Sequence, residues 1–146
     1  MFTNTQTARE RLRAWRTFRQ QFDKKNGTIE DVVEAFGNVE IKARYLDYYT
    51  PDSWPSVFEI VQDGEFCQTG LTLVLGSTLH YLGFIKSKQL EFDVVSNHIT
   101  GIEGIVLIYE NNAYNFLPGK VVTVDYMLEN STVYDRHIIA TDNFYT

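Results

Sequence analysis

The spacing of apolar residues changes at Gly83, and this change constrains the fold more than any other feature of the sequence. Before Gly83 the apolar residues recur every three or four positions, as on one face of a helix; after it they alternate with polar residues, as in a strand. The sequence therefore predicts an α+β fold, with helices first and then an antiparallel sheet of four to five strands. Since 146 residues with 44% hydrophobic content suit one core, we expect a single domain.

The first two helices have recognisable start and stop signals. Thr7 lies three residues before Glu10, which is a capping-box pattern, and it predicts an amphipathic helix over about 7–24. Thr28 opens a second helix, which Gly37 ends. We therefore expect two antiparallel helices at the start of the chain.

Two less regular segments follow these helices. Residues 39–49 fit both a helix and an extended edge, and a helix is preferred. Ser53, followed by Pro55, resembles a capped helix start with proline in the first turn. This pattern predicts a short helix from residue 54 to residue 61.

The longest apolar stretch, residues 66–82, has apolar side chains around nearly the whole circumference of a helix. A helix that is apolar all round is buried. We therefore expect this central helix to pack on the sheet, whose predicted strands cover residues 90–94, 105–109, 114–116, 121–127 and 134–140. Turns are expected at 111–112 and 118–119, where Asn and Gly tolerate a positive φ.

Charge is unevenly distributed along the chain. Residues 1–25 carry seven basic and two acidic side chains, a net charge of +5, so the remaining 121 residues carry −11. The chain thus divides into a basic amphipathic helix at 1–25, a helical part at 26–83 and an antiparallel sheet at 84–146. The basic segment is either a solvated helix face or an arm that docks on an acidic protein partner; the acidic remainder makes nucleic acid an improbable partner.

Composition also bears on compartment and cofactors. No stretch reaches the ~18 consecutive apolar residues of a membrane span, and no apolar signal segment follows the first charges. One cysteine cannot form an internal disulfide, which agrees with a reducing compartment, so we expect a cytoplasmic protein without membrane contact. Because the sequence lacks metal-ligand spacing and a Gly-rich phosphate loop, no metal or cofactor is expected.

Cys67 is the candidate for chemistry, because it lies where a short turn runs into the central helix. Exposed N–H groups and the positive end of the helix dipole favour a thiolate at such a position. His98 and Asn115 follow it in the order of a thiol-hydrolase triad. His137 is an alternative base, whereas His80 lies thirteen residues along the same helix, roughly 20 Å from the thiol. Alternatively, Cys67 is a small hydrophobic residue buried in the core.

With a cysteine at the head of a buried helix and strands afterwards, the chain resembles the transglutaminase-like, papain-type cysteine fold over about residues 54–126. The run from 104 to 116 is similar to the histidine strand and following hairpin of that family. In the family the histidine lies at the start of a strand after the cysteine helix, and an Asp or Asn on the next strand orients it. Here Ile99 to Glu103 separate His98 from its strand.

The resemblance implies a role for each of four residues. Cys67 takes the position of the nucleophile, His98 that of the base and Asn115 that of the orienting residue. Gln62 takes the position of a side-chain oxyanion donor, beside the backbone N–H of Cys67. The implied reaction is acyl transfer on a protein or peptide substrate: the thiolate attacks an amide or ester carbonyl, and water or an amine resolves the thioester.

A second function class fits the sequence as well. A non-catalytic interaction or structural protein would keep the fold for its surfaces, and Cys67 would then fill the core. The short, aromatic-rich chain resembles proteins of tailed bacteriophages in its general style, either accessory virion components or factors acting in the host cytoplasm.

Overall fold

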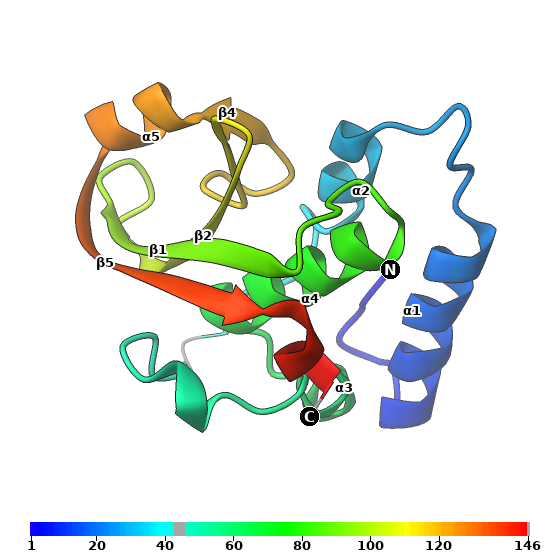
Figure 1. The fold of residues 1–146 in the computed structure, drawn as a ribbon. Helices are drawn as coiled ribbons and strands as arrows, with labels where there is room; N and C mark the ends of the chain where they lie inside the picture. Colours follow the sequence, from blue (N-terminus) through cyan, green and yellow to red (C-terminus); the bar gives the residue numbers. More distant parts are fainter. Residues whose placement is uncertain (43–45, 146) are drawn as a thin grey trace.

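The computed structural model describes residues 1–42 and 46–145. Within them, five α-helices and a five-stranded antiparallel sheet form one body (Figure 1). The strands follow one another across the sheet in the order β4-β3-β2-β1-β5. The predicted α+β fold is therefore confirmed. No described helix is both long enough and apolar enough to cross a membrane.

Helices α1 to α4 precede the strands, as predicted, whereas α5 lies between β4 and β5. The helices are α1 (Ala8–Gln21), α2 (Ile29–Ala35), α3 (Val57–Asp63), α4 (Gln68–Tyr81) and α5 (Val124–Glu129), with 3-10 helices η1 (Pro51–Ser53) and η2 (Thr141–Tyr145). The strands are β1 (Gln89–Asn97), β2 (Glu103–Tyr109), β3 (Asn112–Tyr114), β4 (Val121–Thr123) and β5 (Ser131–Ala140).

The first two helices begin at the predicted residues. The Thr7 hydroxyl accepts the N–H of Glu10 at 3.2 Å, and the Thr28 hydroxyl accepts the N–H of Asp31 at the same distance. In both cases the acidic side chain accepts the backbone N–H of the capping threonine, so both capping boxes are complete.

The third helix begins later than predicted. Ser56 caps α3 in a box with Glu59, whereas Trp54 lies outside the helix and donates its indole N–H to the carbonyl of Asp47 at 2.7 Å. The preferred helix over 39–49 is also wrong in residues 39–42 and 46–49, which are not helical; residues 43–45 lie outside the described residues. The N–H of Lys42 donates instead to the carbonyl of Phe66 at 2.7 Å.

The predicted strand over 121–127 is half strand and half helix. β4 ends at Thr123, whose hydroxyl accepts the N–H of Tyr126 at 3.1 Å and so caps α5. Met127 of α5 is buried and packs against the face of the sheet that α4 does not cover. A short apolar run satisfies either period, so the cap decides between strand and helix.

α4 lies at the centre of the molecule, between the sheet and helices α1, α2 and α3 (Figure 1). Nearly all of its side chains are buried, as predicted for residues 66–82. It packs on the sheet mainly through β2. The core on this face includes Leu75, Leu79, Phe92, Ile105 and Leu107.

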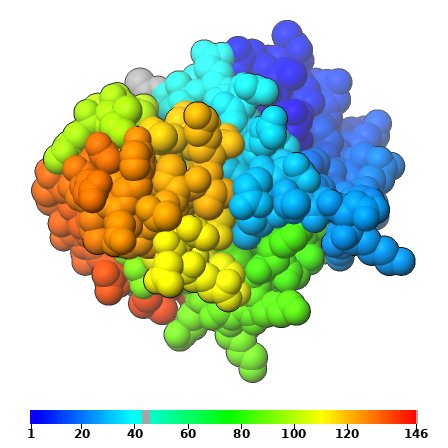
Figure 2. Space-filling model, turned by 90° about the horizontal axis from the view of Figure 1, so that it is seen from above, coloured from blue at the N-terminus to red at the C-terminus, as the bar shows by residue number. Residues whose placement is uncertain are grey.

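The end of α2 lies against the turn between β3 and β4. A side chain at Gly37 would meet the backbone of Gly119 at 2.6 Å, so the two glycines permit this approach. In Figure 2, seen from above, the blue-to-cyan surface of the α2 region adjoins the yellow-to-orange surface of the region of β3 and β4. The helical part is thereby joined to the outer strands.

The basic segment is packed into the body rather than detached from it. Trp15 of α1 is 1% exposed, and its indole N–H donates to the hydroxyl of Thr78 in α4 at 2.9 Å. The guanidinium of Arg11 donates to the carbonyls of Val61 and Gln62 at the end of α3. Helix α1 is therefore part of the core.

Candidate active site

Cys67 is the N-cap residue of α4, as the sequence predicts. Its backbone is extended (φ −94°, ψ 172°), and its Sγ accepts the N–H of Gly70 at 3.4 Å. The residue is 6% exposed and forms no disulfide. The sulfur therefore takes the place that a Ser or Asp oxygen holds at most helix starts.

Two surface hollows reach Cys67 from different sides. The first, of ≈ 440 Å³, opens beside α3 and is lined by Leu46, Pro55, Glu59, Ile60, Gln62, Asp63, Glu65, Cys67 and Gly70. The second, of ≈ 470 Å³, opens toward the start of β2 and is lined by Ile41, Lys42, Tyr48, Cys67, Gln68, Thr69, Ile102 and Glu103. Cys67 lines both hollows, and we refer to the two together as the cleft at Cys67.

Glu103 is the first residue of β2 and shares the second hollow with Cys67. Its carboxylate accepts the hydroxyl of Tyr48 at 2.6 Å. From the sequence, Glu103 is only one of the residues that separate His98 from its strand. Glu103 thus begins a strand that follows the cysteine helix, which is where the resembled family carries histidine, and it lines the same hollow as Cys67.

His98 lies in the turn after β1 and is exposed. Its Nε2 is 2.9 Å from the hydroxyl of Thr132 on β5. In the sheet, Glu103 pairs with Ser96, which pairs on its other side with Thr132. Because neighbouring strands are ~4.8 Å apart, Thr132 lies about 10 Å from the backbone of Glu103. The structure thus directs His98 toward β5, whereas Cys67 lies beside β2.

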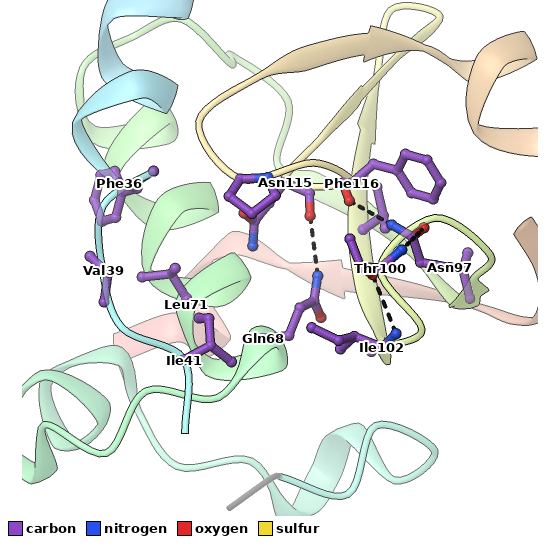
Figure 3. A pocket seen from close by; sticks show the side chains of 15 residues that line it. Phe36, Val39, Ile41, Gln68, Leu71, Asn97, Thr100, Ile102, Asn115 and Phe116 are labelled. Carbon is purple, nitrogen blue, oxygen red and sulfur yellow. Dashed lines mark hydrogen bonds between the residues drawn. The ribbon is translucent and has the colours of Figure 1, made fainter. Parts of the chain in front are cut away.

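Asn115 is held close to the first turns of α4. It is 8% exposed, has a φ of +68°, and donates its side-chain amide to the Thr72 hydroxyl at 2.8 Å. Its carbonyl accepts the side-chain amide of Gln68 at 3.3 Å (Figure 3). Asn115 is therefore brought near the head of the cysteine helix, where its amide bonds to α4 and not to a histidine.

Gln68 is a positioning residue that sequence analysis missed. Its amide also donates to the carbonyl of Ile105 at 2.7 Å, and so it joins the head of α4 both to β2 and to the residue that follows β3. A side chain at Gly104 would clash with the amide oxygen of Gln68. Gly104 lies one residue before the predicted strand 105–109 and inside the observed β2, and a glycine in a strand is the sequence signal for such a close approach.

Gln62, the predicted oxyanion donor, lines the first hollow together with Cys67. It lies near the end of α3, and its carbonyl accepts a guanidinium N–H of Arg11. Of the four predicted site residues, the structure therefore brings Gln62 and Cys67 to one hollow and Asn115 to the adjacent face of α4.

The other two histidines, His137 and His80, do not line the hollows at Cys67. His137 on β5 donates its Nε2–H to the carbonyl of Tyr48 at 2.7 Å and packs edge-on against Trp54. His80 lies at the far end of α4. Over residues 1–42 and 46–145, no group of three or more His, Cys, Asp or Glu side chains could hold a metal ion.

Comparisons with known proteins identify the architecture. No protein-family model matches the sequence, and no curated protein matches it. Three solved structures of LapG from Legionella pneumophila are similar to the chain. The calcium-bound form has a TM-score of 0.68 at 14% identity, covering 94% of this chain and 82% of LapG. A second LapG structure has a TM-score of 0.66 at 15% identity, covering 91% of this chain and 79% of LapG. The EGTA-treated form has a TM-score of 0.64 at 15% identity, covering 91% of this chain and 77% of LapG.

The chain has the fold of LapG. This is the transglutaminase-like cysteine protease fold, so the resemblance inferred from the sequence is confirmed for the architecture. The likeness extends over 94% of the chain and not only over residues 54–126. At 14% identity it shows the fold alone. The comparisons give no support to a bacteriophage origin.

Proposed function

We propose that this protein is a non-catalytic, cysteine protease-like domain that binds an extended polypeptide segment in the cleft at Cys67 without cleaving it. The observation that carries the proposal is the carboxylate of Glu103 at the start of β2, in the same hollow as the thiol.

Acyl transfer by a thiol requires a base within hydrogen-bonding reach of the sulfur. Glu103 holds the hydroxyl of Tyr48 at 2.6 Å and has no N–H to donate to a leaving group when ionised. The imidazole of His98 interacts with Thr132 on the far side of β1. These contacts favour a cleft that has kept its shape but lacks a Cys–His pair.

The cleft suits a polypeptide in size and lining. Each of its two hollows has the volume of a typical ligand pocket, about 300–1,000 Å³. Apolar side chains such as Ile60 and Ile102 lie beside carboxylates such as Glu59 and Glu103, so the cleft can take both apolar and basic side chains of a bound segment.

Acyl transfer by Cys67 is the second candidate function. It is favoured by the thiol at a helix N-terminus, where Sγ accepts the N–H of Gly70 and the residue lines both hollows. In that function His98 would be the base, Asn115 the orienting residue and Gln62 an oxyanion donor. It would require His98 to leave Thr132 and approach Cys67.

The pH dependence of iodoacetamide modification separates the two functions. Cys67 is the single cysteine, so mass spectrometry reports its modification without ambiguity. We expect the same pH profile for the wild type, for His98→Ala and for the matched control His80→Ala. A shift of the profile in His98→Ala alone would establish a Cys–His pair and replace our proposal by acyl transfer.

Binding is tested with β-casein, an unstructured protein that offers many extended segments. We expect a complex without cleavage products. Ile102→Arg, which fills the second hollow, should weaken the complex about tenfold. Ile99→Arg, at an isoleucine outside the hollow that is 50% exposed against 41% for Ile102, should leave it unchanged. Cleavage of β-casein, or equal effects of the two variants, would contradict the proposal.

A further inference from the structure

A patch of aromatic and basic side chains, all exposed except the half-buried Arg19, lies apart from the cleft, where four elements meet. We call it the basic-aromatic patch; its members are Arg16, Arg19 and Lys24 from α1 and the residues after it, Phe58 from α3, Tyr81 from α4 and Tyr145 from η2. These residues come from distant parts of the sequence, so only the fold assembles them.

Arg19 is at the centre of this patch. Its Cζ lies 3.8 Å from the ring centroid of Trp15 and 5.1 Å from that of Tyr81. Lys24 Nζ lies 5.7 Å from the Tyr81 ring, and Arg16 and Tyr145 are close enough to Arg19 to influence its pKa, although burial is the largest cause of its lowering. Cations and rings therefore form one continuous surface.

The aromatic members of the patch remain open to solvent. Tyr81 is 47% exposed, and Phe58 and Tyr145 are each 38% exposed. The rings of Phe58 and Tyr145 lie 5.9 Å apart, so they form one apolar area and not scattered single residues. Clustered exposed aromatic side chains beside arginine are typical of protein-binding surfaces.

The cations of the patch form no ion pair within the described part of the chain. Among the described residues, no carboxylate lies within ion-pairing distance of a cation of α1; the ion pairs found there involve Lys42 and Arg136. The acidic residue of the helix, Glu10, accepts the backbone N–H of Thr7 at 2.9 Å, and hydrogen bonds from Thr7, with a smaller contribution from the charge of Arg13, lower its pKa. Arg9, Arg13 and Arg16 follow at steps of four and three residues, so they extend the patch as a stripe along α1.

From this surface we infer that the basic-aromatic patch binds an acidic polypeptide segment that also carries aliphatic or aromatic side chains. The carboxylates of the segment would pair with Arg13, Arg16 and Arg19, and its apolar side chains would cover Phe58 and Tyr81. A nucleic acid has the same sign of charge, but the net charge of −6 would repel a long phosphate backbone beyond the patch. A short acidic segment avoids that repulsion.

The test uses the full chain and a fluorescein-labelled twelve-residue peptide of alternating Glu and Leu or Phe, read by fluorescence anisotropy. Arg13→Gln combined with Arg16→Gln removes two exposed cations of the stripe, and Lys88→Gln combined with Lys120→Gln removes two exposed cations elsewhere. We expect the first pair to weaken binding by about tenfold and the second by less than about twofold. Tyr81→Ser should weaken it in the manner of the first pair.

Three outcomes would overturn the inference. They are no saturable binding by the wild type, an equal loss in the two double variants, or tighter binding of a twelve-nucleotide oligo-dT than of the peptide. The Arg13 and Arg16 variants should leave the modification rate of Cys67 unchanged, so failure here is distinguishable from failure of the cleft proposal.

Discussion

At the scale of single residues, Asp93 is the group whose protonation the fold changes most clearly. It lies between Phe92 and Val94 of the core and so points to the face of the sheet away from α4. Burial, assisted by Glu91, raises its pKa from 3.8 to about 7, although Arg136 opposes the shift with its Nε 3.4 Å from Asp93 Oδ1.

This shift predicts a pH dependence of stability. The folded protein keeps the Asp93 proton up to about pH 7, whereas the unfolded chain loses it near 3.8. The stabilisation by the protonated group is therefore present at low pH and lost as the pH rises through this window. We expect Asp93→Asn to gain in free energy of unfolding, relative to the wild type, between pH 4 and pH 8, as measured by urea denaturation.

Asp52→Asn is the matched control, because Asp52 is exposed on η1. Its free energy of unfolding relative to the wild type should show no such rise over the same pH range. An Asp93→Asn variant that stays parallel to the wild type from pH 4 to pH 8 would show that this carboxyl group is ionised throughout.

At the scale of elements, capping decides where helices begin. Both Ser53 and Ser56 precede apolar residues, but only Ser56 has Glu59 three residues later to complete a capping box. Pro55 suits a first helical turn, and this led sequence analysis to start the helix too early. The reciprocal bonds of the box outweigh that preference.

The capping assignment predicts different effects of two serine substitutions. Ser56→Ala should lower the free energy of unfolding by about 1 kcal/mol, because the N–H of Glu59 loses its acceptor. Ser53→Ala lies outside α3 and should cost less than about 0.5 kcal/mol. Chemical denaturation of both variants measures the difference, and a larger loss in Ser53→Ala would contradict the observed start of α3.

At the scale of the whole molecule, the basic segment serves both the core and the surface. Trp15 and Arg11 of α1 face the body, whereas Arg9, Arg13 and Arg16 face solvent. Amphipathic helices commonly divide their faces in this way. The basic residues that the sequence presented as a possible docking arm therefore lie on the solvent-facing side of α1, a helix that is part of the core.

Removal of residues 1–25 should therefore unfold the protein and not merely abolish association. Loss of a buried Trp alone costs about 3–5 kcal/mol, which is a large part of the stability of a typical domain. We expect the truncated chain to lack a cooperative thermal transition in circular dichroism. A truncated chain that melts cooperatively near the wild-type temperature would show that α1 is dispensable for folding.

The sequence by itself determined the features that depend on neighbours a few residues away. The capping boxes at Thr7 and Thr28, the Cys67 start of α4 and the change of period at Gly83 all arise from interactions within about one helical turn or one strand alternation. The α+β class and the transglutaminase-like fold follow from the order of these elements.

Only the tertiary structure decided which side chains meet at Cys67. Glu103 pairs with Ser96 of β1 and lines the same hollow as Cys67, whereas Ser96 pairs on its other side with Thr132, which His98 contacts. Register depends on the packing of residues that are tens of positions apart, and the sequence order of a Cys, a His and an Asn does not encode it. For that reason the architecture could be predicted from the chain, whereas the contents of its cleft could not.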